Sequence, residues 1–128
     1  MKTIIHVEDS ELILLRLAEW IVEIDPTFTV LPAQSLGEAE ALLKQYAPDF
    51  MVLDVNLPDG NALNRLLDFK KLCPHMQVAV LTNSNDAFTR LKCKQLGADW
   101  VFDKAIDIPM LVEVLSEAVT QFGNIQEV

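Results

Sequence analysis

Five short apolar segments alternate with five longer amphipathic segments along the chain. The short segments are rich in β-branched residues, and several are hydrophobic at nearly every position, which is typical of parallel strands covered on both faces. We predict strands at Thr3–Val7, Phe28–Ala33, Phe50–Asp54, Gln77–Leu81 and Trp100–Asp103. We predict helices at Ser10–Glu23, Leu36–Gln45, Asn61–Leu72, Asp86–Leu96 and Ile108–Gln121. The alternation indicates successive βαβ units.

Strands and helices in this order predict an α/β fold with an open, doubly wound, five-stranded parallel sheet and five helices. Right-handed crossovers place the helices on both faces of such a sheet. The chain has 128 residues, 51% of them hydrophobic, which suffices for one domain with its own core. We therefore predict a single domain at residues 1–122 and a short tail at 123–128.

Helix ends can be recognised at several positions. Ser35 and Glu38 have the spacing of a capping box, in which the Ser side chain accepts a hydrogen bond from a first-turn N–H and the Glu side chain reaches back to the cap residue. Asp107 followed by Pro109 is a second start signal, and Gly97 is placed to end the fourth helix in a left-handed conformation. These signals support the helix boundaries.

The net charge of the chain limits the classes of molecule that it can bind. Ten Lys and Arg residues stand against nineteen Asp and Glu residues, for a formal net charge of -9. Nucleic-acid binding requires the neutralisation of phosphates, so we expect no direct binding to DNA or RNA. No apolar stretch has the length of a membrane span, and the first apolar run is too short for a signal peptide. We expect a cytoplasmic protein with no membrane partner.

Charged and hydroxyl side chains follow the predicted strands at the ends where ligands bind in doubly wound sheets. Glu8 and Asp9 follow the first strand, Asp54 ends the third, Thr82 follows the fourth and Lys104 follows the fifth. Three neighbouring carboxylates repel one another unless a cation lies among them. Mg²⁺ suits such a site because it prefers oxygen ligands and commonly joins carboxylates to phosphate.

With a divalent cation in place, Asp54 can act as a nucleophile toward phosphorus. Phosphoryl transfer needs in-line positioning and neutralisation of the phosphoryl oxygens. Mg²⁺, Lys104 and Thr82 can supply that neutralisation.

The chain closely resembles the response-regulator receiver family from Lys2 to about Phe122. The segments that carry the resemblance are Val7-Glu8-Asp9-Ser10, Val52-Leu53-Asp54-Val55-Asn56-Leu57-Pro58, Leu81-Thr82-Asn83-Ser84 and Phe102-Asp103-Lys104. The resemblance implies a flavodoxin-like sheet of strand order 2-1-3-4-5. It also implies a role in two-component signal transduction.

The resemblance assigns a role to each site residue. Asp54 would be the phosphoacceptor, Glu8 and Asp9 would hold Mg²⁺, and the backbone carbonyl of Asn56 would complete the metal shell. Thr82 would hydrogen-bond the phosphoryl group and Lys104 would pair with it. The phosphoryl donor would be a histidine kinase or a phosphotransfer protein, and output would pass through contacts with a downstream protein or a phosphorylated second copy of the chain.

The chain departs from the family pattern at positions that take part in signal output in that family. The aromatic residue usual three positions before the lysine is replaced by Val101, and the proline after the lysine is replaced by Ala105. The phosphoryl chemistry is therefore expected without the usual aromatic switch.

Three other functions compete with a free-standing receiver. The chain could be the receiver of a longer transcriptional regulator, although residues 123–128 lack the composition of a linker. An Asp-nucleophile phosphatase would need a second acid two residues after the nucleophile, where this chain has Asn56. A flavin-binding electron carrier would need a phosphate-binding loop after the first strand, where Glu8 and Asp9 would repel the phosphate. We expect a phosphoacceptor signalling domain rather than an enzyme, with at most slow self-catalysed phosphorylation and dephosphorylation.

Overall fold

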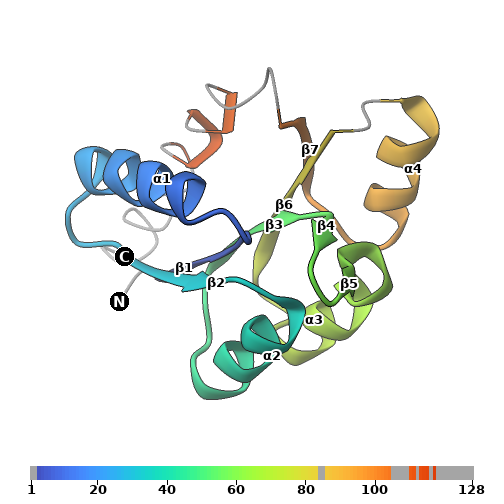
Figure 1. The fold of residues 1–128 in the computed structure, drawn as a ribbon, viewed down its shortest axis with the longest axis horizontal. Coiled ribbons are helices and arrows are strands. Elements are labelled where there is room, and N and C mark those ends of the chain that lie inside the picture. Colours follow the sequence, from blue (N-terminus) through green and yellow to red (C-terminus); the bar gives the residue numbers. More distant parts are fainter. Residues whose placement is uncertain (1–2, 84–85, 105–109, 112, 116, 118–128) are drawn as a thin grey trace.

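A five-stranded parallel sheet forms the centre of the molecule (Figure 1). In this computed structural model, the described residues are 3–83, 86–104, 110–111, 113–115 and 117. The strands of the sheet are β1 (Thr3–Val7), β2 (Thr29–Ala33), β3 (Phe50–Asp54), β6 (Gln77–Thr82) and β7 (Trp100–Asp103). They lie in the order β2-β1-β3-β6-β7, and each neighbouring pair is parallel. The predicted strand order 2-1-3-4-5 is therefore confirmed.

Helices cover both faces of the sheet (Figure 1). The helices with eight or more residues are α1 (Glu11–Ile24), α2 (Leu36–Gln45) and α4 (Ala87–Gln95), and α3 (Leu66–Leu72) is shorter. Residues 110–111, 113–115 and 117 are also helical, within the segment predicted as the fifth helix. None of the described helices has the length and apolar character that a membrane span requires.

The core lies in two layers, one on each face of the sheet, because alternate side chains of a strand point to opposite faces. Ile4 joins the layer beneath α1 and the residues Leu111 and Leu115. Ile5, the next residue, joins the layer beneath α2 and α3. Both isoleucines are fully buried, which explains why β1 is apolar at successive positions.

The predicted helix Asn61–Leu72 is wrong in its first half. The chain forms a small antiparallel hairpin between β4 (Asn56–Leu57) and β5 (Gly60–Asn61), then one 3₁₀ turn, η1 (Ala62–Asn64), and only then α3. Gly60 has φ +143°, and the Asn61 side chain accepts a hydrogen bond from the Leu63 N–H at 2.9 Å. These local interactions hold the backbone out of the α-helical conformation until Leu66.

Two of the predicted helix-end signals are confirmed. Ser35 Oγ accepts from the Glu38 N–H at 3.1 Å, while the Glu38 carboxylate accepts from the N–H of Gln34, one residue before the cap. Gly97 has φ +110° just after α4. The signal at Asp107 and Pro109 and the tail at 123–128 lie outside the described residues.

Candidate functional site

The carboxyl ends of four strands bring the predicted site residues to one edge of the sheet. Glu8 follows β1, and its N–H donates to the Ala33 carbonyl at 2.8 Å, which fixes the chain as it leaves the sheet. Asp54 is the last residue of β3 and lies beside Leu81 of β6. Lys104 follows β7, and its N–H donates to the Thr82 carbonyl at 2.9 Å. Backbone hydrogen bonds thus position each of these side chains.

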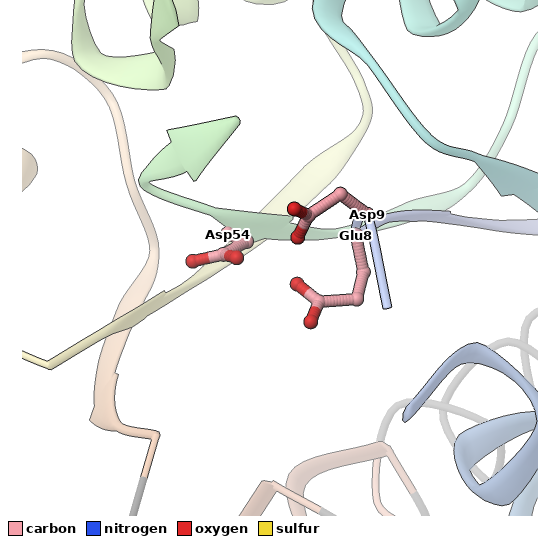
Figure 2. Close-up of side chains that lie close together, drawn as sticks. All are labelled: Glu8, Asp9 and Asp54. Atoms are coloured by element: carbon pink, nitrogen blue, oxygen red, sulfur yellow. The ribbon is translucent and has the colours of Figure 1, made fainter. Parts of the chain in front are cut away.

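Three of the carboxylates form a cluster. One oxygen from each of Glu8, Asp9 and Asp54 lies within 4.8 Å of the others. Figure 2 shows the three side chains, from the ends of β1 and β3, directed toward a shared space. Glu8 is 1% exposed and Asp54 is 4% exposed, whereas Asp9 is exposed. The cluster therefore opens to solvent on the side of Asp9.

Lys104 closes the buried side of this cluster. Its Nζ lies 2.9 Å from Asp54 Oδ2, and 3.0 and 3.1 Å from the two carboxylate oxygens of Glu8. One ammonium therefore contacts both buried acids of the cluster. The predicted convergence of acids and amine at one edge of the sheet is confirmed by this geometry.

The buried acids and Lys104 change one another's pKa values. Burial, followed by the hydrogen bond with Asp54, raises the pKa of Glu8 to about 7, and Lys104 opposes this rise only in part. Burial acts against the charge of Lys104, but hydrogen bonds to Asp54 and Glu8 outweigh it and raise the pKa of its ammonium. A single lysine thus does not fully offset the effect of burial and of the neighbouring acid on Glu8.

This donor set fits a hard divalent cation. The three clustered side chains offer carboxylate oxygens only, the ligands that Mg²⁺ and Ca²⁺ prefer. A cation beside Glu8 would also relieve the repulsion that helps to raise the pKa of this residue. Glu8, Asp9 and Asp54 are the residues that could hold it.

The two other predicted site residues lie beside the cluster. Thr82 ends β6, next to Leu81, and is 3% exposed. Asn56 is exposed in β4, two residues beyond Asp54, and pairs with Asn61 across the hairpin. Thr82 thus continues the strand that pairs with Asp54, and Asn56 continues the chain beyond Asp54 itself.

Sequence reasoning missed the contact of Asp59 near the site, and for His6 it predicted a core position correctly but expected paired ring nitrogens. The Asp59 carboxylate accepts hydrogen bonds from the first turn of α2. The sequence signal at this position is the Pro-Asp-Gly segment, which predicts a turn and not this contact. His6 is a core residue, but neither ring nitrogen has a partner among the described residues. Burial lowers the pKa of His6 to about 4, so the ring is neutral at pH 7.

A comparison with models of protein families shows which family this chain matches. The model of the response regulator receiver domain matches residues 4–116. The chain belongs to the response regulator receiver domain family. This receiver domain is thus a signalling module of two-component systems, and its sheet is the doubly wound, flavodoxin-like sheet of that family.

Individual relatives agree with this assignment. The receiver is 32% identical over 90 residues to the alginate biosynthesis transcriptional regulatory protein AlgB of Pseudomonas aeruginosa, and the match covers 70% of this chain and 20% of AlgB. It resembles the beryllofluoride-activated NtrC4 receiver domain dimer with 28% identity and a TM-score of 0.82, covering 95% of this chain and 99% of that one.

A Burkholderia pseudomallei response regulator, solved with a phosphorylated aspartic acid, calcium ion and citrate, shares the fold. Its TM-score is 0.80 at 20% identity, over 100% of this chain and 76% of that one. The receiver spans 18% to 56% of the length of the first curated relatives it matches. Those relatives are longer proteins that contain a similar domain.

Proposed function

We propose that this receiver domain accepts a phosphoryl group on Asp54 in a Mg²⁺-dependent reaction. The observation that carries the proposal is the position of the Asp54 carboxylate, which lies within 4.8 Å of Glu8 and Asp9 and 2.9 Å from Lys104 Nζ. A nucleophile, a place for a cation and a fixed ammonium thus meet at one edge of the sheet. Membership of the receiver family supports the same reading.

The chemistry follows from these neighbours. A carboxylate oxygen of Asp54 attacks phosphorus in line with the P–N bond of a phosphohistidine. A P–O bond to Asp54 forms as the P–N bond breaks, and its electron pair stays on the leaving imidazole, which takes up a proton. Lys104 pairs with the transferred group, and Thr82 donates a hydrogen bond to it.

Mg²⁺ would be held by Glu8, Asp9 and Asp54 together with the Asn56 carbonyl, and it would supply positive charge for the phosphoryl oxygens. Two proteins with this fold support a divalent cation as the ligand: the Burkholderia pseudomallei response regulator solved with a calcium ion, and the Mn(2+)-bound form of the response regulator Rcp1. Positive charge here also offsets the repulsion between the phosphoryl group and the neighbouring acids.

The donor in this proposal is a histidine kinase or a phosphotransfer protein, and the protein acts in the cytoplasm. Phosphorylation changes its contacts with a downstream protein or with a second copy of itself, for which the NtrC4 receiver dimer is the supporting relative. Self-catalysed phosphorylation and dephosphorylation would be slow. The second candidate is a receiver that belongs to a longer regulator, because the curated relatives are longer than this chain.

Intact mass measurement tests the proposal. Wild-type protein incubated with Mg²⁺ and acetyl phosphate should gain one phosphoryl group, and Asp54→Asn should gain none because the amide is a poor nucleophile. Asp68→Asn, an exposed acid of α3, is the matched control and should behave as wild type.

Omission of Mg²⁺ should abolish incorporation into the wild-type protein. Incorporation that persists in Asp54→Asn would show that another residue accepts the phosphoryl group.

A further inference from the structure

One exposed carboxylate, Asp59, ties the loop after Asp54 to the start of α2. Asp59 Oδ1 accepts from the Leu36 N–H at 2.9 Å, and Oδ2 accepts from the Gly37 N–H at 3.0 Å. First-turn N–H groups have no partner within their own helix, so they are available to a side chain from elsewhere. These two hydrogen bonds also hold the pKa of Asp59 below its usual value.

Helix α2 also has a local cap of its own, made by Ser35 and Glu38. Ser35 Oγ accepts from the Glu38 N–H, and the Glu38 carboxylate accepts from the Gln34 N–H at 2.7 Å. The Asp59 contacts come in addition, and they join residues 22 and 23 positions apart in the sequence. They therefore connect two segments of the fold rather than start a helix.

The loop that Asp59 anchors begins at the phosphoacceptor. Its backbone is fixed at one end by the Val55 N–H, which donates to the Leu81 carbonyl, and at the other by the Ala62 N–H, which donates to the Val55 carbonyl. Between these ends, β4 and β5 pair through Asn56 and Asn61, and Asp59 lies in the turn that joins them (Figure 1). The turn is thus held from outside the hairpin by α2.

We propose that Asp59 is a positioning residue that holds the Asn56 backbone carbonyl in place for a divalent cation beside Asp54. This inference rests on the proposed function, in which that carbonyl is a metal ligand. A carbonyl that is already in place adds to affinity without an ordering cost, whereas a loose hairpin must be ordered when the cation binds. Asp59 acts through the hairpin and does not itself contact the metal.

Mg²⁺ titrations followed by amide chemical shifts test this role in the intact protein. Asp59→Ala removes both acceptors. We expect the Mg²⁺ dissociation constant to rise about fivefold, because the loss of a side chain that caps a helix has an effect of about this size. Asp59→Asn keeps one acceptor oxygen, so its dissociation constant should lie between those of wild type and Asp59→Ala.

Ser35→Ala is the matched control, because it removes a hydrogen bond from the same helix end without touching the hairpin. Its thermal unfolding midpoint should fall about as far as that of Asp59→Ala, while its Mg²⁺ affinity stays at the wild-type value. Asp59→Ala with wild-type affinity, or Ser35→Ala with an equal loss of affinity, would overturn this inference and leave the proposed function unaffected. Wild-type protein that binds no Mg²⁺ would overturn the proposed function as well.

Discussion

Lys104 sets the charge balance of the site at the scale of single residues. It contacts both buried carboxylates, so one positive charge serves two buried acids. Breaking a buried pair by removing one partner is costly, because the remaining charge stays buried and uncompensated. In the proposed reaction, the ammonium that contacts Glu8 and Asp54 before phosphorylation is therefore the group that would pair with a phosphoryl oxygen afterwards.

His6 gives the fold a dependence on pH at the same scale. The pKa of His6 falls to about 4 chiefly because the ring is buried; Asp54 acts against the shift and Lys104 adds to it. Above the ordinary value of 6.5 the ring is neutral in both the folded and the unfolded chain. Between pH 6.5 and about 4 only the unfolded chain takes up the proton, so stability is lost as the pH falls.

We predict that His6→Leu is more stable than wild type at pH 5, because it removes both this proton uptake and an unpaired buried imidazole. The difference in unfolding free energy should grow between pH 7.5 and pH 5 by about 2 kcal/mol, since about 1.5 pH units lie between 6.5 and 5 at about 1.36 kcal/mol each. Urea denaturation in EDTA measures it. Glu8, whose raised pKa acts in the opposite sense, is present in both proteins, so its contribution cancels in the difference. A difference that does not change with pH would contradict the prediction.

At the scale of elements, the end of α4 depends on one glycine. Gly97 has φ +110°, a conformation that residues with a Cβ rarely adopt, and a Cβ here would lie 3.3 Å from Lys70 Cγ. Lys70 in turn bonds the Met76 carbonyl and Asp99, which precedes β7. The glycine therefore affects both the end of α4 and the start of the last strand.

We predict that Gly97→Ala lowers the free energy of unfolding by about 1 kcal/mol or more, because alanine must adopt the strained conformation. Gly37→Ala is the control: Gly37 lies in α2, and its added Cβ would meet the Asp59 carboxylate at an ordinary 3.6 Å. Thermal unfolding should show a loss for Gly97→Ala alone. Equal midpoints for the two variants would refute the importance of the backbone conformation.

The accuracy of sequence reasoning also differed between elements. The bounds of β1, β3 and β7 were predicted correctly, because strands buried on both faces are apolar at most positions. The start of α3 was predicted too early. Ala62, Leu63 and Leu66 suit a helix, but hydrogen bonds of the hairpin and the Asn61 side chain determine the backbone there.

At the scale of the whole molecule, the site could be predicted because every one of its strands ends at the same edge. That topology brings Glu8, Asp54 and Lys104 together although they lie far apart in the sequence. The sharing of one ammonium between two acids, and the contact of Asp59 with α2, could not be predicted. Both depend on side-chain positions between elements distant in sequence.

We predict that Mg²⁺ stabilises the whole domain, because a ligand that binds only the folded state raises its unfolding free energy. At a Mg²⁺ concentration about ten times the dissociation constant, the gain should be about 1.4 kcal/mol. Asp9→Asn should gain less, since it lacks one carboxylate of the cluster, while its stability in EDTA should not fall because a repulsive charge is gone. Chemical denaturation with and without Mg²⁺ compares the two. Equal gains would exclude Asp9 as a ligand.

The bond between Lys104 and Glu8 spans 96 positions of the chain. The segments that follow β1 and β7 must both be in place before Lys104 meets Glu8 and Asp54. During synthesis, Glu8, Asp9 and Asp54 leave the ribosome well before Lys104 does. A partly synthesised or partly unfolded receiver therefore lacks the assembled site, so only the completely folded domain can receive a signal.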